Sequence, residues 1–461
     1  MSHHLSELGH AMKNTLALVL AGGRGTRLDP LTATQSKPAL PFGGQFRLVD
    51  FPLSNCINSG IRRIGVATQY RSHALIHHVQ RTWGFMRPEF GEFVELWPAQ
   101  QQTPKECWYC GTADAVYQNI ALIEEHGPRY VLILAGDHAY KQNYARLIAQ
   151  HVDTGADVIV SCVEAPRALA TGFGVVGVDR ENGIVSFVEK PNDPQTIPGS
   201  PSRSFASMGI YVFDADFLIE RLRDDADNGH SSHDFGKDIL PSLVGNCRMV
   251  AHRFADSNVA SGPVGEPYWR DVGTLDAYWE ANLDLTRVTP ELDLYDRGWP
   301  IWTHQHRRPA AKFVFEQPDR RGAAVNSLVS LGCIVSGGLV RQSLLFTDVR
   351  VNSFSLVEDS VLLPGASVGR YSRLHRTVVS EGCHIPEGLV VGEDPEEDAR
   401  HFHRTAGGVT VVTRAMLARL ERTRALPPRR ARPRLSPTVA TKTPAAPVGG
   451  GGSLGPPART A

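Results

Sequence analysis

The 461-residue sequence has no net charge and no long apolar run. Lysine plus arginine equal aspartate plus glutamate at 48 each, so the chain lacks the basic field that non-specific nucleic-acid binding uses. No run approaches the roughly 18 apolar residues that span a bilayer, and the first residues lack the pattern of a secretory signal. We therefore expect a cytoplasmic protein with neither a nucleic-acid nor a membrane partner.

Cysteine is sparse, and motifs for covalent catalysis are missing. The seven cysteines are scattered and odd in number, which fits a reducing compartment better than a disulfide framework. Cys107 and Cys110 form a CxxC pair without a second pair close enough to complete a zinc site, so we interpret them as ordinary thiols. There is no nucleophile-elbow serine, HExxH motif or Cys/His/Asn set. Direct displacement at phosphorus, which needs positioning, cations and metal, stays compatible with the chain.

The first part of the sequence alternates apolar strands with helical stretches. We expect strands at residues 15–21, 130–135, 157–163, 184–189 and 209–213, and a helix at 113–125 with Thr112 as its N-cap. This alternation predicts an α/β domain with a mostly parallel sheet covered on both faces. We assign it to residues 14–295, after a flexible N-terminus at residues 1–13.

Residues 296–415 begin with a Pro- and Trp-containing connector at 299–309, after which the sequence changes to short β-rich pieces with many Gly, Ser and Val. Apolar residues recur there at intervals of six, with two slips in register: Cys333, Leu339, Leu345, Val351, Val357 and Leu363, then Leu362, Val368 and Leu374, then Val379, Ile385 and Val391. Such a repeat predicts a triangular parallel β-helix, with chance spacing in a Val-rich sandwich as the alternative. Residues 416–461 read as a helical end and a disordered Pro/Ala/Arg-rich tail, whose basic segment at 429–434 we interpret as solvated.

Glycines and cations follow the first strand. The segment LAGGRGTRL at residues 20–28 places glycines where a turn brings backbone N–H groups close to an anion. Its spacing is neither that of a dinucleotide fingerprint nor that of a Walker loop. Arg24, Arg27 and Lys37 add three cations, which fit a triphosphate better than a packing turn. The segment predicts a phosphate-binding loop, with a purely structural turn as the alternative.

Two aspartates and a lysine complete the candidate site. Asp137 follows an apolar strand, at the edge where open α/β sheets bind ligands. Asp271, in the motif YWRDVG, supplies a second carboxylate, and two carboxylates can hold a magnesium ion that keeps phosphate oxygens and water. Lys190 ends the strand at 184–189 and can neutralise a phosphate. Each of these residues alone also fits an ordinary turn, cap or surface position.

Several longer motifs resemble one enzyme family. LAGGRGTRL resembles the signature of sugar-nucleotide pyrophosphorylases in general. Narrower stretches resemble bacterial glucose-1-phosphate adenylyltransferases: FGGQFRLVDF at 42–51, LSNCINSGI at 53–61, WYCGTAD at 108–114, SSHDFGK at 231–237 and YWRDVGT at 268–274. The resemblance covers residues 14–415. It implies a Rossmann-like catalytic domain, a left-handed parallel β-helix and a homotetramer.

The resemblance also implies the reaction and the residues that perform it. ATP plus α-D-glucose 1-phosphate would give diphosphate and ADP-glucose for glycogen (α-glucan) synthesis, by magnesium-assisted attack of the sugar phosphate on the α-phosphorus. The catalytic residues would be Arg27, Lys37, Asp137 and Lys190, with Asp137 and Asp271 holding Mg²⁺. The substrate-binding residues would be Gly22, Gly23, Gly25, Thr26, Tyr109, Gly111, Gly174, Glu189, Lys190 and Ser207.

Departures from the family pattern concern regulation. The basic residues by which enteric-type members bind a sugar-bisphosphate activator are missing, as shown by Thr34, Gln35 and Pro41. We therefore expect weak or no activation by fructose 1,6-bisphosphate. Other basic regulatory positions are matched by Arg47, Arg400 and Arg404, which predicts that an anionic metabolite acts as effector. The enteric pattern has arginine where Cys110 stands beside Tyr109.

Three other functions stay open at this point. A relative that uses dTTP, UTP or GTP would share the glycine loop, although the narrower motifs favour ATP. A non-catalytic regulatory subunit would not need the charged residues Arg27, Asp137, Lys190 and Asp271, all of which are present. A hexapeptide-repeat acyltransferase would need a catalytic histidine, for which His375 and His384 are the candidates, each more simply explained as a solvated histidine.

Overall fold

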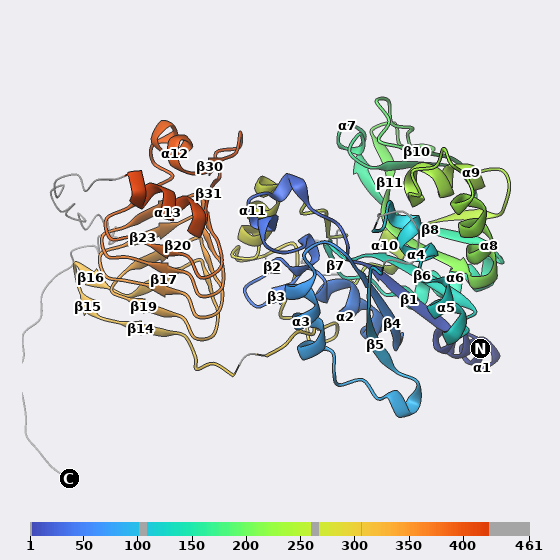
Figure 1. Cartoon of the computed structure of the whole chain (residues 1–461), viewed down its shortest axis with the longest axis horizontal. Coiled ribbons are helices and arrows are strands. Elements are labelled where there is room, and N and C mark those ends of the chain that lie inside the picture. Colours follow the sequence, from blue (N-terminus) through green and yellow to red (C-terminus); the bar gives the residue numbers. More distant parts are fainter. Residues whose placement is uncertain (1, 101–107, 260–266, 306, 424–461) are drawn as a thin grey trace, which may run out of the picture.

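The computed structural model of the chain describes residues 2–100, 108–259, 267–305 and 307–423, which form two domains side by side (Figure 1). Cys107, the disordered tail predicted after residue 423 and its basic segment at 429–434 lie outside the described residues. Within the described ranges, no helix combines the length and apolarity needed to cross a membrane.

The first domain is built from a central sheet and surrounding helices. Its helices are α1 (Ser2–Lys13), α2 (Asp50–Ser59), α3 (His73–Thr82), α4 (Thr112–Tyr117), α5 (Ile120–His126), α6 (Tyr144–Thr154), α7 (Arg167–Ala170), α8 (Ala215–Ala226), α9 (Leu240–Leu243), α10 (Phe254–Ser257) and α11 (Leu275–Asp284). Its strands are β1 (Thr15–Leu20), β2 (Pro41–Phe42), β3 (Phe46–Arg47), β4 (Arg63–Thr68), β5 (Phe93–Pro98), β6 (Tyr130–Ala135), β7 (Ala139–Tyr140), β8 (Val158–Pro166), β9 (Gly174–Val178), β10 (Ile184–Glu189), β11 (Arg203–Asp214), β12 (Met249–Arg253) and β13 (Trp269–Arg270). Short helical turns are η1 (Thr26–Leu28), η2 (Leu31–Ala33), η3 (Lys37–Ala39), η4 (Pro88–Phe90) and η5 (Phe235–Ile239).

The central sheet has the strand order β10-β9-β11-β6-β1-β4-β5, and β8 pairs with both β11 and β12. Strands β6, β1, β4 and β5 run parallel, as do β8 and β12, whereas β11 runs antiparallel to its neighbours. Helices and loops cover both faces, so the central strands are continuous apolar runs. The parallel strands β1 and β6 therefore end side by side at one edge of the sheet.

Four local predictions differ from the structure. The N-terminus expected to be flexible forms helix α1, because Ala11 and Met12 bury themselves in the core. The helix expected at 113–125 is divided into α4 and α5 at Asn119, whose side-chain amide bonds the Ala115 carbonyl. The N-cap of α4 is Gly111, not Thr112, whose hydroxyl instead contacts residues 234 and 235. Strand β11 is longer than the predicted strand at 209–213.

The second domain consists mostly of short strands. They are β14 (Lys312–Val314), β15 (Glu316–Gln317), β16 (Arg320–Arg321), β17 (Ala323–Val325), β18 (Leu328–Val329), β19 (Ile334–Ser336), β20 (Leu339–Arg341), β21 (Leu344–Leu345), β22 (Arg350–Val351), β23 (Leu356–Glu358), β24 (Val361–Leu362), β25 (Ser367–Val368), β26 (Arg373–His375), β27 (Thr377–Val379), β28 (His384–Ile385), β29 (Val390–Val391), β30 (His403–Arg404) and β31 (Thr410–Val412). Two helices, α12 (Pro395–His401) and α13 (Arg414–Thr423), follow the coils.

Apart from the antiparallel pair β15–β16 and strand β30, which pairs antiparallel with β31, these strands form the three sides of a parallel β-helix, consistent with the predicted left-handed repeat (Figure 1). The sides are β14-β19-β22-β25-β28, β17-β20-β23-β26-β29 and β18-β21-β24-β27-β31, each with parallel pairing throughout. Register pairs Val351 with Val368, so this coil is one residue short of three full hexapeptides. The six-residue series is wrong at Leu339, because Val340 occupies the interior instead. The predicted slip from Leu363 to Leu362 is confirmed: Leu362 lies in the core of the β-helix, whereas Leu363 is buried in the core shared with the first domain.

One side of the β-helix packs against the first domain. Leu344, Val361 and Val378 from this side share a continuous apolar core with Tyr278 and Trp279 of α11. All five side chains are buried. The two domains are therefore joined by a common hydrophobic core in addition to the connector.

Candidate active site

A cleft of about 910 Å³ opens at the edge where β1 and β6 end. Eleven predicted site residues line it: Gly22, Gly23, Arg27, Tyr109, Gly111, Asp137, Gly174, Glu189, Lys190, Ser207 and Asp271. Gly25 and Thr26, predicted to bind substrate, do not line the cleft. Gly25 has φ 61° and lies against the Lys37 side chain, so its role in the structure is to turn the loop into η1.

The glycine loop enters the cleft directly from β1. The Ala21 N–H bonds the Ala67 carbonyl at 2.9 Å, which holds the loop beside β4. A side chain at Gly22 would approach Gln69 closely, whereas Gly23 has open space around it. Exposed backbone at Gly23 can therefore approach an anion.

Antiparallel pairing of β7 and β13 brings the two acidic residues together. Ala139 pairs with Arg270, so the residues flanking these strands, Asp137 and Asp271, meet at one place. The Lys37 ammonium lies between them, 3.0 Å from Asp137 Oδ2 and 2.7 Å from Asp271 Oδ1. Lys37 does not line the cleft itself, because its side chain is only 7% exposed.

Neighbouring charges shift the pKa values of Asp137 and Lys37. Burial alone favours the neutral form of Asp137, but the ammonium of Lys37 and the nearby His138 outweigh burial and lower the pKa of Asp137 to about 2. Burial likewise opposes the charge on Lys37, but Asp137 and Asp271 outweigh it and raise the pKa of the ammonium. Asp137 and Lys37 are therefore both ionised at neutral pH.

The donor set of this edge fits a hard divalent cation. Two carboxylates converge on one cationic atom, and oxygen ligands of this kind suit Mg²⁺ when phosphate and water complete the shell. Within the described residues, no group of three or more His, Cys, Asp or Glu side chains is arranged to hold a metal by itself. A metal here would therefore complete its shell with water or with oxygens of a bound phosphate.

A second charged pair lies across the cleft. Lys190 Nζ donates to Glu189 Oε1 at 2.6 Å, and Lys190 has φ 49° where β10 ends. Gly174 pairs with Glu189 across β9 and β10, and a side chain at Gly174 would collide with the Glu189 carboxylate. The lysine stays 59% exposed and can reach an anion in the cleft.

Ser207, which lies in β11, and Tyr109 also line the cleft. A register shift in β11 and the positive φ of Gly209 turn Ser207 inward, where its hydroxyl lies 3.4 Å from that of Tyr211. The Tyr109 hydroxyl accepts a hydrogen bond from Asn119 at 2.9 Å. Burial is the main cause that raises the pKa of Tyr109, so its phenol stays a neutral hydrogen-bonding group.

Several cleft residues were missed by sequence reasoning. Asp234 caps the turn η5, accepting the Gly236 N–H at 3.0 Å and the Thr112 hydroxyl at 3.0 Å. Others lie far from the glycine loop in sequence and become neighbours only through folding: Gln69, Tyr70, Trp108, His138, Tyr211, Phe235 and Trp269. The SSHDFGK and WYCGTAD motifs contain Asp234, Phe235 and Trp108, so the motifs were the available signal.

The three predicted regulatory arginines each have a partner in the structure. Arg47 bonds the Ala39 carbonyl and forms an ion pair with Glu381 of the β-helix at 3.4 Å. Arg400 pairs with acidic residues of its own helix, α12. Arg404 lies 3.5 Å from Asp398. Each guanidinium has a carboxylate partner, so an anionic effector would have to compete with that partner.

The histidines considered for acyl transfer have surface partners. His384 Nδ1 lies 2.7 Å from the Ser367 hydroxyl, and His375 lies 3.8 Å from Asp359. Neither histidine lines the cleft. The geometry supplies no support for the acyltransferase alternative.

Comparisons with known proteins match both domains. Residues 16–288 match the nucleotidyl transferase family, and residues 309–412 match the GlmU-like, C-terminal hexapeptide family. The chain is 63% identical over 414 residues to a glucose-1-phosphate adenylyltransferase of Rhodospirillum rubrum, covering 90% of this chain and 98% of the relative. It is 58% identical over 407 residues to the enzymes of that name from Paramagnetospirillum magneticum and Nitrosospira multiformis, covering 88% of this chain and 95% of each relative.

Proposed function

The chain belongs to the glucose-1-phosphate adenylyltransferase family of nucleotidyltransferases, and from this we propose that it converts ATP and α-D-glucose 1-phosphate to ADP-glucose and diphosphate. The observation that carries the proposal is the meeting of Asp137, Asp271 and Lys37 beside an open glycine loop. This arrangement provides cations and metal ligands for phosphate groups, and direct displacement at phosphorus requires those groups.

The two ends of the cleft would bind different substrates. The glycine loop, with Gly22, Gly23 and the Arg27 guanidinium, would hold the phosphates of ATP. Lys190 would bind the phosphate of glucose 1-phosphate, while Glu189 accepts hydrogen bonds from sugar hydroxyls. The hydrogen-bonding groups of Tyr109, Gly111, Gly174 and Ser207 would contact the sugar nucleotide.

The reaction would be a single displacement. A phosphate oxygen of glucose 1-phosphate forms a bond to the α-phosphorus of ATP while the bond to the bridging oxygen of the diphosphate breaks. Mg²⁺, held by Asp137 and Asp271, would neutralise charge on the phosphate oxygens. Lys37 and Arg27 would keep the reacting groups aligned and balance the charge that develops on the leaving diphosphate.

Further parts of the proposal concern the cell and the assembly. ADP-glucose would serve as donor for glycogen (α-glucan) synthesis in the cytoplasm, and the protein would act as a homotetramer. An anionic metabolite would act as effector through Arg47, Arg400 or Arg404, displacing their carboxylate partners.

Pyrophosphate release by the purified protein, with Mg²⁺, ATP and glucose 1-phosphate, tests the proposal. We expect turnover in the wild type, and a loss of about 10²-fold or more in kcat for Asp137→Asn, which keeps the shape of the side chain but removes its charge. Asp319→Asn, an exposed carboxylate of the β-helix, is the matched control and should behave as wild type. Equal activity of Asp137→Asn and the control would contradict the assigned role of Asp137.

A further inference from the structure

Helix α11 directly follows one of the acidic residues of the cleft. Its N-cap, Thr274, lies three residues after Asp271, and the Gly273 N–H bonds back to the Asp271 carbonyl at 2.7 Å. Val272 and Leu275 within this short link are buried. Because the link is short and packed, a displacement of α11 displaces the Asp271 carboxylate with it.

The same helix anchors the segment that carries Lys37. This segment continues from η3 into β2, where the Pro41 carbonyl accepts a hydrogen bond from the Tyr278 hydroxyl. The Gly43 N–H donates to Asn282 Oδ1 at 3.0 Å. Tyr278 and Asn282 are both fully buried. The two chain segments that meet in the ion pair of the cleft are therefore both fastened to α11.

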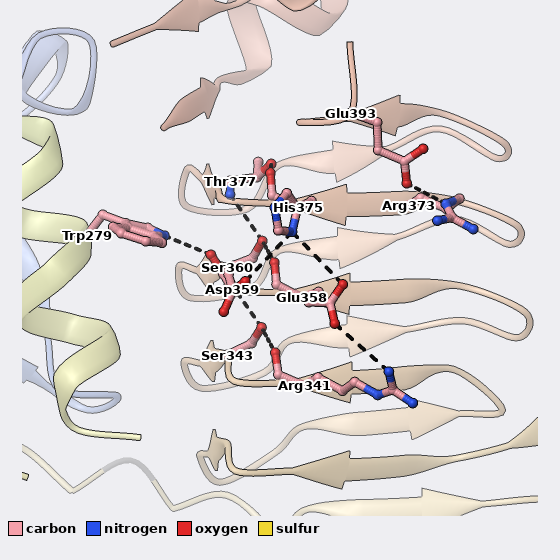
Figure 2. Close-up of polar contacts among 10 residues, drawn as sticks. All are labelled: Trp279, Arg341, Ser343, Glu358, Asp359, Ser360, Arg373, His375, Thr377 and Glu393. Carbon is pink, nitrogen blue, oxygen red and sulfur yellow. Dashed lines mark hydrogen bonds and ion pairs between the residues drawn. The ribbon is translucent and has the colours of Figure 1, made fainter. Parts of the chain in front are cut away.

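Another face of α11 is held by the β-helix. The Trp279 indole N–H donates to the Asp359 carbonyl at 2.8 Å (Figure 2), and the Arg376 guanidinium lies 4.5 Å from the centre of the Trp279 ring. Nearby on the helix, Asp276 accepts the Thr405 hydroxyl at 2.6 Å. A cation over an indole and two hydrogen bonds give this contact a defined geometry.

The corner of the β-helix that touches Trp279 is itself well ordered by hydrogen bonds. Asp359 and Arg376 occupy equivalent corner positions in successive coils, both with φ 47°. The residues that follow them form a ladder, in which the Ser360 N–H donates to Ser343 Oγ at 3.0 Å and the Thr377 N–H donates to Ser360 Oγ at 3.1 Å (Figure 2). These hydroxyl-bearing side chains are buried, so the corner offers α11 a fixed support.

We propose that Trp279 is a positioning residue for the metal-binding carboxylate of Asp271, and that the corner at Asp359 and Arg376 sets the position of α11. The inference rests on the proposed function, because it concerns the placing of the Lys37–Asp271 pair for that reaction. The β-helix thereby takes part in building the metal site, although none of its residues lines the cleft. Groups behind metal ligands commonly control metal affinity in this way.

Substitutions at the contact test the proposal. Arg376→Gln removes the cation above the indole, and Trp279→Phe keeps an aromatic ring but removes the N–H donor. We expect the Mg²⁺ concentration for half-maximal activity to rise by about threefold to tenfold and kcat to fall, because about one net interaction that holds α11 is lost. The KM for glucose 1-phosphate should stay unchanged, since Lys190 lies on a different element.

A second readout does not depend on activity. Hydrogen–deuterium exchange of the unliganded protein should become faster in the segment 271–275 for both variants. Arg376→Lys restores a cation above the ring and should recover most of the wild-type behaviour. Arg341→Gln is the matched control, because Arg341 lies on the same side of the β-helix, faces Glu358 at 4.0 Å and has no contact with α11 (Figure 2).

The exchange and Mg²⁺ measurements together decide whether Trp279 and Arg376 position Asp271. Faster exchange at 271–275 and a raised Mg²⁺ requirement in Arg376→Gln, absent in Arg341→Gln, support the positioning role. A folded Arg376→Gln protein with wild-type exchange and wild-type Mg²⁺ response overturns it, whether or not Trp279→Phe folds. Failure of the proposed function would appear separately, as a wild-type protein without turnover, and the exchange measurement would still judge the link through α11.

Discussion

Replacing Lys37 with methionine should remove the cation that the carboxylates of Asp137 and Asp271 share. In the wild type, the Lys37 ammonium contacts Asp271 at 2.7 Å and Asp137 at 3.0 Å, and the lysine side chain is 7% exposed. Methionine retains an unbranched, apolar stem of comparable length but brings no charge. The variant leaves two partly buried carboxylates without their shared cation, so it should be less stable and should depend on added divalent metal.

The size of the effect follows from burial. Removing one partner of a fully buried ion pair costs about 3–5 kcal/mol. The carboxylates of Asp137 and Asp271 are 29% and 20% exposed, so water screens part of their repulsion. We therefore expect the free energy of unfolding to fall by about 2 kcal/mol at neutral pH. Mg²⁺, which can take the place of the ammonium between the carboxylates, should restore much of this loss.

The pH dependence of the loss has a definite sign. In the wild type, the pKa of Asp137 is depressed to about 2, so its contribution to stability is present above its unfolded pKa and is lost as pH falls through the folded value. Without Lys37, repulsion and burial raise the carboxylate pKa values, so protonation then favours the folded state. The stability difference between wild type and Lys37→Met should therefore be smallest near about pH 2, where Asp137 of the wild type becomes protonated, and grow toward about pH 7.

Urea unfolding at several pH values, with and without Mg²⁺, measures these effects. Lys141→Met is the matched control, because Lys141 is a fully buried lysine that pairs with one carboxylate, Asp296, at 3.2 Å and does not line the cleft. The control should lose stability without any rescue by Mg²⁺. If Lys37→Met shows the same pH profile and the same Mg²⁺ response as Lys141→Met, the account of a cation-bridged carboxylate pair is wrong.

Three further substitutions or additions give checkable outcomes. Gly111→Ala would place a methyl group against the His233 carbonyl, so we expect the activity to fall by about tenfold or more and the protein to lose about 1–3 kcal/mol of stability, measured by kinetics and urea unfolding. Arg320→Gln removes a guanidinium 3.5 Å from the Phe315 ring centre and should lower the stability of the β-helix by about 1 kcal/mol in the same unfolding assay. Fructose 1,6-bisphosphate should activate weakly or not at all in a steady-state assay, and activation of about tenfold would contradict the reading of Thr34, Gln35 and Pro41.

The fold could be predicted from the sequence where the apolar pattern of a segment matches its burial in the structure. The strands at residues 130–135 and 184–189 have the predicted bounds, because Gly, Pro or charged residues flank both segments. The hexapeptide pattern predicted the β-helix but misplaced Leu339, because coils of fewer than three full hexapeptides shift the inward position by one residue, here to Val340. Helix α1 escaped prediction, since its burial comes from Ala11 and Met12 packing on distant elements.

The charged residues of the candidate site could be identified from the sequence, but their arrangement in space could be predicted only in part. Asp137 was expected at the sheet edge because it follows β6, but its proximity to Asp271 depends on the pairing of β7 with β13, two strands of two residues each. Such short pairings leave no periodic trace in a sequence. The contact of Trp279 with the corner at Asp359 could not be predicted from the sequence either. Its two partners belong to elements that meet only in the folded chain.

A nucleotide panel tests the central claim most directly. The purified wild-type protein is given Mg²⁺, glucose 1-phosphate and, in separate reactions, ATP, UTP, GTP or dTTP, and both diphosphate and the sugar nucleotide are quantified. The account predicts ADP-glucose and diphosphate in equal amounts with ATP, and a kcat/KM at least about 10²-fold lower with each other nucleotide. Preferred use of UTP, GTP or dTTP, or absence of any sugar nucleotide with ATP, would contradict it.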